Sequence, residues 1–256
     1  MIPPLVFWSL IYIAYSVFVV GDNNILFFDL VKKIIRNLLH GSKFHLWFVY
    51  TLLGLYLFIP ILRKWVKQAH KKEFHYFLIL WFATTLYAIP ALKLYLPNLE
   101  LVNFSGYLGY LVLGYYLSKL KIKNKILPSL CIVIGVAITF FGTYYSTKTN
   151  GDFEQYFYGY LSPNVMLSAI GIFLLFKSIS FKSNIAEKVS SFISNHSFGI
   201  YLVHVLVLSV MSTYGIDWKF MHPIFSIPIT KAICLLISSL IIYLLRKIKY
   251  ADYISG

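Results

Sequence analysis

Charged side chains are scarce in this sequence. Only 12% of its 256 residues are Asp, Glu, Lys or Arg, and 59% are hydrophobic, whereas a soluble domain carries about 25% charged residues. A chain with so few charges cannot cover a surface that faces water, which excludes a soluble globular domain. The remaining solvent for so much apolar area is lipid, where the backbone must satisfy its own hydrogen bonds.

The alternation of apolar and polar residues that marks the strands of a membrane barrel is also lacking. Long apolar runs in lipid are therefore expected to be helices, each needing about 20 residues to span a bilayer. Eight such runs cover residues 3–21, 45–62, 75–95, 103–118, 127–146, 160–177, 197–214 and 226–245. We predict an all-α fold: a polytopic transmembrane helical bundle of about eight helices, forming one domain over residues 1–256.

Cysteine is nearly absent as well. Cys131 and Cys234 lie in separate apolar runs, so nothing implies a disulfide framework, and both are interpreted as small core or lipid-facing residues.

The sequence contains no metal-ligand spacing, no glycine loop that would cradle a phosphate and no nucleophile elbow. We therefore expect no metal cofactor.

Basic residues outnumber acidic ones by 23 to 9. They gather in short clusters between apolar runs, which is typical of membrane topology signals and argues against nucleic-acid binding. The main clusters are Arg63, Lys64, Lys67, Lys71 and Lys72; Lys119, Lys121, Lys123 and Lys125; Lys177, Lys182 and Lys188; and Arg246, Lys247 and Lys249. Placing these four segments in the cytoplasm predicts that both termini are cytoplasmic.

Residues 22–44 depart from this charge pattern. They should lie outside, yet they contain four basic residues, and their apolar residues recur at helical spacing on the opposite face. The apolar stripe is Phe27, Leu30, Val31, Ile34, Ile35 and Leu38, and the basic residues are Lys32, Lys33, Arg36 and Lys43. This pattern predicts an amphipathic helix lying on the outer membrane surface.

The first apolar run has the complementary anomaly. Residues 1–4, MIPP, would enter the membrane from the cytoplasm without a single lysine or arginine. Local charge bias alone would insert this helix the other way round. We therefore expect that basic residues, and further helices, once preceded Met1.

Polar groups within the seventh run are candidates for chemistry, because burying them in a membrane is costly. Ser197, Tyr201 and His204 are spaced by four and three residues, so they share one helical face. An imidazole buried there is expected to be neutral, since desolvation disfavours its cation, and can take a proton from a hydroxyl. The alternative is that His204 only hydrogen-bonds a neighbouring helix.

Aromatic residues accompany a histidine at the start of the second run. Trp47 and Tyr50 are explained as an interfacial aromatic belt, and His45 at the water boundary could simply be solvated. In the fourth run, glycine alternates with tyrosine over residues 105–116. Small residues let helix backbones approach closely, so packing is the expected role of that segment.

Four blocks of the sequence, in order, resemble the acyltransferase-3 family of integral-membrane acyltransferases. They are residues 41–50 (GSKFHLWFVY), 109–117 (GYLVLGYYL), 161–165 (LSPNV) and 197–204 (SFGIYLVH). The resemblance implies transfer of an acetyl or other acyl group from a cytoplasmic acyl-CoA, such as acetyl-CoA, to a hydroxyl. The acceptor would be a cell-envelope sugar, as in O-acetylation of a polysaccharide or a lipid-linked sugar.

If the protein acts as the resemblance implies, we expect the candidate residues to take the following places. His204, Tyr201 and Ser197 would line an interior path as the catalytic candidates. Substrate-binding residues would lie at both ends of that path: Arg63 and Lys64 attract the phosphates of the donor, while His45, Trp47 and Tyr50 face the sugar at the outer mouth. The protein would be a multi-pass protein of the bacterial cytoplasmic membrane, with the lipid bilayer, the donor and the glycan as partners and no nucleic acid.

The chain also departs from the family pattern. Members have about ten helices, and their first helix carries an arginine and a histidine needed for acyl transfer; a basic loop then leads into a segment similar to residues 2–12. No residue here matches that arginine or histidine, so the resemblance predicts an N-terminally truncated member. Two alternatives remain open: a transporter or flippase for polysaccharide precursors, and an inactive member that acts as an assembly partner.

Overall fold

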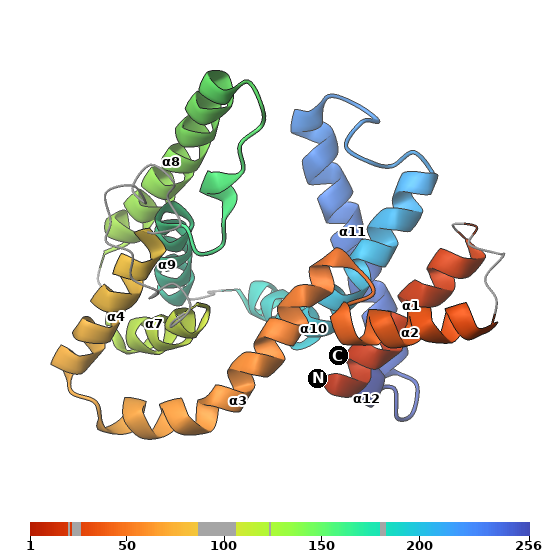
Figure 1. Cartoon of the computed structure of the whole chain (residues 1–256), viewed down its shortest axis with the longest axis horizontal. Coiled ribbons are helices and arrows are strands. Elements are labelled where there is room, and N and C mark those ends of the chain that lie inside the picture. The colour runs from red at the N-terminus through yellow and green to blue at the C-terminus, as the bar shows by residue number, and fades with distance from the viewer. Residues whose placement is uncertain (20, 22–26, 87–105, 123, 180–182) are drawn as a thin grey trace. The chain divides into compact units, whose positions relative to one another are not determined.

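The computed structural model describes residues 1–19, 21, 27–86, 106–122, 124–179 and 183–256. Within these residues the chain is helical and has no strand. It divides into two compact units, Met1–Gly54 together with Phe181–Gly256, and Leu55–Ser180. Helix α3 (Trp47–Gln68) begins in the first unit and continues in the second (Figure 1).

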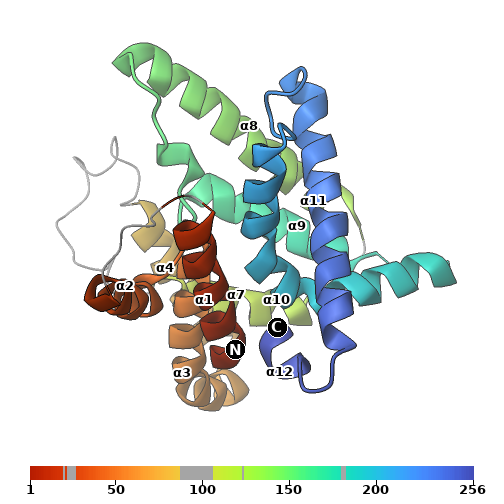
Figure 2. The same ribbon diagram turned by 90° about the vertical axis from the view of Figure 1, so that its right-hand side faces the viewer.

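The first unit combines the two ends of the chain. Its elements are α1 (Ile2–Phe18), α2 (Phe27–His40), the 3₁₀ turn η1 (Phe44–Leu46), the first turns of α3, α10 (Asn184–Thr213), α11 (Pro223–Arg246) and α12 (Asp252–Ser255). Helices α10 and α11 pack along each other (Figures 1 and 2). Helix α1 contacts α2, α10 and α12, so the N-terminal helix is held by the C-terminal elements.

The second unit contains the middle of the chain. Besides the rest of α3, it comprises α4 (Lys71–Leu86), α7 (Leu108–Lys119), α8 (Ile126–Asn150), the 3₁₀ turn η2 (Tyr156–Tyr158) and α9 (Pro163–Lys177). Helices α8 and α9 pack along each other (Figure 1). The ammonium group of Lys177 donates to the carbonyls of Leu117, Ser118 and Leu120, which stabilises the C-terminal end of α7.

The prediction of an all-helical membrane fold is confirmed. Within the described residues, five segments are long and apolar enough to cross a bilayer: Phe44–Gln68, Ile126–Asn150, Tyr156–Lys177, Asn184–Thr213 and Pro223–Arg246. The other three predicted runs coincide with α1, α4 and α7, whose described parts have 17, 16 and 12 residues. Residues 87–95 and 103–105 of these predicted runs lie outside the described residues.

Two features of the C-terminal half differ from the prediction. Helix α10 begins at Asn184, well before the predicted start at residue 197. The apolar pattern marks only the part of a helix that can lie in lipid, whereas residues 184–196 are too polar for that pattern and still contain no helix breaker. The short helix α12 was not predicted, because four residues carry no periodicity that can be recognised.

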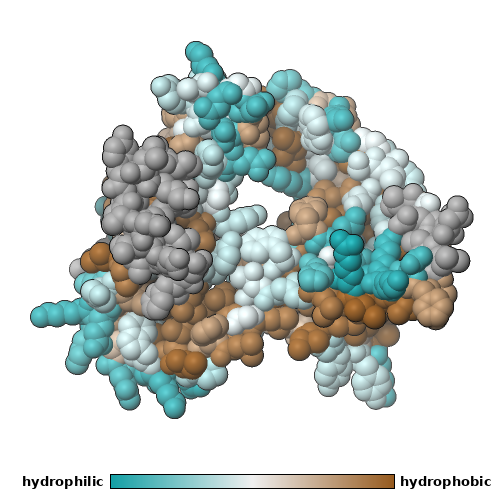
Figure 3. All heavy atoms as spheres, viewed as in Figure 1, coloured by the Kyte–Doolittle hydropathy of each residue, from teal (hydrophilic) through white to brown (hydrophobic). Residues whose placement is uncertain are grey.

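The segment predicted to form an amphipathic helix does so over Phe27–His40; residues 22–26 lie outside the described residues. Its aromatic residues Phe27 and Phe28 are 73% and 77% exposed, and Ile35 is also exposed. Lys32, Arg36 and other polar residues line an opposite groove, and in this region hydrophilic side chains lie beside an apolar band (Figure 3). The expected location on the outer membrane surface stays a prediction.

One face of α1 builds the core of the first unit. Leu5, Trp8, Ser9 and Tyr12 recur at the spacing of a helix face, and each is buried. Leu5, Trp8 and Tyr12 belong to one apolar cluster with residues of η1, α3, α10 and α11, including Leu46. This cluster surrounds the side chains that could carry chemistry.

Close helix packing at glycine was predicted for the fourth run and is found at Gly109. A Cβ atom there would lie 2.0 Å from the Trp81 indole, so only glycine lets α7 approach that ring. Gly114 on the same helix has nothing within 4 Å of such an atom. The packing role is therefore confirmed for Gly109 and not for every glycine of the run.

Replacing Gly199 with alanine is expected to destabilise the protein by about 1–3 kcal/mol, as overpacking does in other cores. The new Cβ would lie 2.4 Å from the Ser255 carbonyl oxygen and 2.9 Å from the Ile242 side chain. Thermal unfolding in detergent measures the effect. Gly114→Ala is the matched control and should leave stability unchanged or raise it by roughly 0.5–1 kcal/mol; equal shifts for the two variants would contradict the close packing.

Candidate functional site

Two histidines from distant parts of the chain meet in the core of the first unit. His45 lies in the 3₁₀ turn η1, directly before α3, and His204 lies on α10. Their ring centroids are 5.2 Å apart, with the rings nearly perpendicular at 76°. His45 is only 6% exposed, so it is buried and not solvated at a water boundary.

Two tyrosines enclose this histidine pair. Tyr201 precedes His204 by one helical turn, and its ring centroid lies 5.6 Å from that of His45. The Tyr201 hydroxyl donates to the backbone carbonyl of His45, which ties η1 to α10. Tyr12, from the buried face of α1, lies on another side of His45 at 5.4 Å.

The hydrogen bond made by His204 defines its tautomer. Its Nδ1 atom lies 2.6 Å from the backbone carbonyl oxygen of Tyr201. A carbonyl only accepts, so Nδ1 must carry the hydrogen. In the neutral imidazole, Nε2 then has the free lone pair, which is the arrangement of a general base whose orientation is fixed by its second nitrogen.

The ring nitrogens of His45, unlike Nδ1 of His204, lack a well-oriented hydrogen-bond partner within the described part of the chain. Among the residues that the structure describes, neither Nδ1 nor Nε2 of the buried His45 ring has a hydrogen-bond partner of good geometry. Leaving a buried polar atom unsatisfied costs about 1–3 kcal/mol, so such groups are rare and need an explanation. The ring of His45 is therefore a buried polar group that is able to bind a polar substrate atom.

The backbone of α10 around His204 is held by two further side chains. The Tyr12 hydroxyl donates to the Leu202 carbonyl at 2.8 Å and accepts from the Leu206 amide at 3.0 Å. These two groups pair with each other in a regular helix, so Tyr12 engages the helix ladder at the turn that carries His204. On the other side, the Cys234 thiol of α11 donates to the His204 carbonyl at 3.5 Å.

The remaining predicted site residues occupy different places. Trp47 contacts the ring of Phe48, and the Tyr50 hydroxyl donates to the Leu38 carbonyl of α2; both belong to the first unit near His45. Ser197 is exposed on α10 and donates to the Ser194 carbonyl, two turns before His204. Arg63 and Lys64 are exposed on the part of α3 that belongs to the second unit.

Tyr12 is the residue of this site that the sequence reasoning missed. The available signal was the spacing of Leu5, Trp8, Ser9 and Tyr12 on one face of the first run, where two polar side chains interrupt an apolar stripe. His45 and His204 were both singled out, but not as neighbours. Their separation of 159 positions in the chain hides a contact that only the fold creates.

Within the described part of the chain, no group of three or more His, Cys, Asp or Glu side chains could hold a metal ion. The site instead offers one fixed proton acceptor, one buried imidazole without a well-oriented partner among these residues, and two ordered phenols. Such a site can deprotonate a hydroxyl and bind a developing negative charge, the two requirements of acyl transfer to an alcohol.

The family described as an acyltransferase domain, which is the acyltransferase-3 family, matches residues 1–245. This range contains His45, His204 and, among the described helices, all but α12 and the last residue of α11. No curated protein matches the chain. No solved structure matches it either.

Proposed function

The chain belongs to the acyltransferase-3 family, and from this premise we propose that it moves an acetyl or other acyl group from a cytoplasmic acyl-CoA to a hydroxyl of a cell-envelope sugar. The observation that carries the proposal is the buried pair of His45 and His204. One imidazole is oriented to accept a proton, and the other has unsatisfied polar atoms beside it.

His204 is the general base of the proposed reaction and is not the counterpart of the first-helix histidine of the family, which no residue of this sequence matches. Its Nε2 atom takes the proton of the acceptor hydroxyl as that oxygen attacks the carbonyl carbon of the thioester. The carbon–sulfur bond then breaks, and the leaving coenzyme A thiolate takes up the proton from His204. The products are the sugar ester and free coenzyme A, and the imidazole returns to its neutral form.

His45 stabilises the negative charge that develops on the thioester oxygen. A neutral imidazole has one N–H donor, and at His45 this donor is buried near the Leu202 backbone but has no hydrogen-bond partner of good geometry among the described residues. A donor kept in an apolar core costs no reorganisation when the charge appears and is stronger there than in water. Tyr201 holds the turn that carries His45, and Tyr12 holds the turn that carries His204.

The other predicted residues have accessory roles in this proposal. Arg63 and Lys64, which are exposed on α3, attract the phosphates of the donor from the cytoplasm. Trp47 and Tyr50 offer aromatic faces to the sugar, and Ser197 extends the polar path along α10. The enzyme then lies in the bacterial cytoplasmic membrane, takes its donor on one side and modifies envelope polysaccharide or its lipid-linked precursor on the other.

The proposed function predicts a loss of envelope ester groups when the protein is absent. Mass analysis of O-acyl content, with the gene, without it and with the gene restored, measures this directly. We expect acylated sugars in the first and third samples and a drop to background in the second. Unchanged ester content, combined with loss of the polysaccharide itself, would favour a transporter of the precursor instead.

A further inference from the structure

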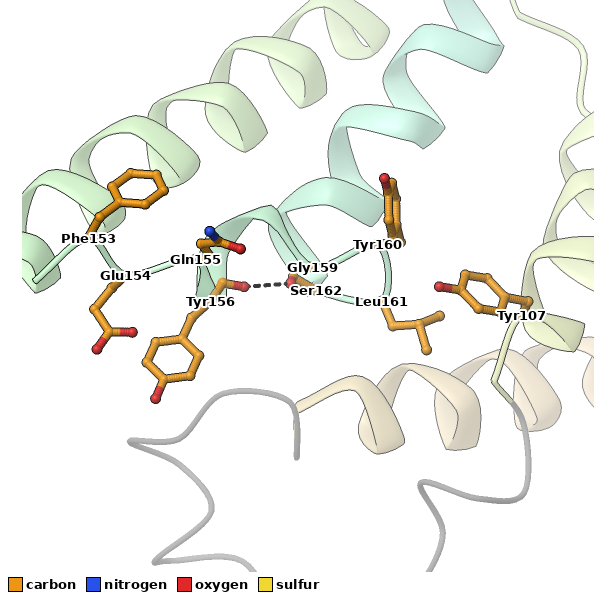
Figure 4. Close-up of a pocket in the computed structure, with 9 residues that line it drawn as sticks. All are labelled: Tyr107, Phe153, Glu154, Gln155, Tyr156, Gly159, Tyr160, Leu161 and Ser162. Carbon is orange, nitrogen blue, oxygen red and sulfur yellow. Dashed lines mark hydrogen bonds between the residues drawn. The ribbon is translucent and has the colours of Figure 1, made fainter. Parts of the chain in front are cut away.

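A second polar and aromatic pocket lies in the other unit, formed mainly by the loop between α8 and α9. Its volume is about 600 Å³, within the range of about 300–1,000 Å³ seen for small-molecule sites. The lining residues are Tyr107, Phe153, Glu154, Gln155, Tyr156, Gly159, Tyr160, Leu161 and Ser162 (Figure 4). None of them belongs to the histidine site.

The loop that forms this pocket is fixed by buried polar side chains. Asn164 is 5% exposed, and its amide donates to the Phe157 carbonyl at 2.7 Å and to the Thr139 hydroxyl at 2.8 Å. Ser162, equally buried, donates to the Tyr156 carbonyl at 3.0 Å. Tyr110 donates to the Tyr160 carbonyl at 2.6 Å. The pocket is therefore largely formed before any ligand binds.

The charge of the residues that line the pocket indicates which class of ligand it can bind. Glu154 contributes a carboxylate, and among the described residues that line the pocket none is a lysine, arginine or histidine. An anion such as the phosphates of coenzyme A would meet the like charge of Glu154. The pocket consequently suits a ligand without negative charge.

The same residues match the two kinds of surface that a sugar presents. The side chains of Glu154 and Tyr156 point to the same side of the loop (Figure 4), and both line the pocket with the Gln155 amide. Carboxylate and amide oxygens accept hydrogen bonds from sugar hydroxyls, and the amide can also donate. The half-exposed Tyr156 ring offers an aromatic face against which the C–H face of a sugar ring can pack.

We propose that this pocket binds an uncharged saccharide segment, with Tyr156 as the aromatic platform and Glu154 and Gln155 as the hydrogen-bonding groups. Identifying that saccharide with part of the acceptor glycan rests on the proposed function.

Saturation-transfer NMR on the purified full chain in detergent tests the binding, with maltohexaose and chitotetraose as uncharged probes and free coenzyme A as the anionic probe. We expect at least one uncharged probe to bind. Any signal from coenzyme A should be the same for the wild type and for Tyr156→Ala. Tyr156→Ala should weaken saccharide binding at least about tenfold, whereas Tyr156→Phe should retain it because the ring remains. Tyr145→Ala, which removes an exposed tyrosine of α8 outside the pocket, is the matched control and should bind as the wild type does.

Acyl transfer is measured in parallel, so that the two proposals fail separately. If Tyr156→Ala raises KM for the glycan with little change in kcat, the acceptor role is supported. If the uncharged probes bind neither the wild type nor Tyr156→Phe, or if Tyr156→Ala binds them like the wild type, the pocket proposal is overturned even when transfer is normal. If the wild type binds saccharide but transfers no acyl group, the acceptor role and the proposed function are overturned. The proposal that the pocket binds a saccharide would still stand.

Discussion

Replacing His204 with alanine is expected to lower acyl transfer by about 10²–10⁴-fold, the usual contribution of a general base. The imidazole Nδ1 is committed to the Tyr201 carbonyl, so the proton-accepting lone pair of Nε2 has no substitute on the same turn. Transfer of labelled acetyl from acetyl-CoA to envelope glycan, in membranes containing equal amounts of each variant, measures the loss.

A second substitution at this position separates chemistry from packing. In His204→Gln, the side-chain amide can still donate to the Tyr201 carbonyl, but it cannot take a proton at neutral pH. We expect the same loss as for alanine. Near-normal transfer by His204→Gln would mean that the histidine serves only to hold α10 against its neighbours. His75→Ala, which removes an exposed histidine of α4, should transfer at the wild-type rate.

Replacing His45 with leucine is expected to abolish most of the activity without destabilising the protein. Both ring nitrogens are buried and lack a hydrogen-bond partner of good geometry among the described residues. An apolar side chain removes the cost of burying these polar atoms, so stability should stay constant or rise by about 1–3 kcal/mol. Transfer should fall by about 10²–10³-fold, as when one donor to a developing oxyanion is removed. Thermal unfolding and the transfer assay on the same preparation give both values.

A loss of stability without a specific loss of activity would show that His45 has no catalytic role. If His45→Leu unfolds at a lower temperature and its activity falls only in proportion to the folded fraction, the histidine is a structural residue. His40→Leu provides the control, since His40 is exposed at the end of α2. That variant should change neither stability nor transfer.

The positions of most helices could be predicted from the sequence because lipid imposes one rule, an apolar run of fixed minimum length. That rule finds α8 and α11 within a few residues. It fails at the start of α10, where residues 184–196 form helix without being apolar, and at α12, which has four residues.

Several residues of the candidate site could be predicted from the sequence, but the contacts between them could not. A histidine within an apolar run is unusual enough to single out His204, and its spacing from Tyr201 places both on one face. The approach of His45 could not be inferred, because Trp47 and Tyr50 beside it also fit an aromatic belt at the membrane surface. The burial of His45 depends on how α1 and α10 pack around η1. These elements are far apart in the sequence, so their contacts leave no local pattern.

The contact between His45 and His204 as one reacting unit is tested most directly by combining the two substitutions. Residues that act together in one step give losses that do not add. We predict that the double variant His45→Leu/His204→Ala falls by less than the product of the two single losses, because residues in contact couple by about 0.5–3 kcal/mol. Losses that multiply, so that the double variant falls by the product of the two single effects, would show that the histidines act independently and would contradict the site described here.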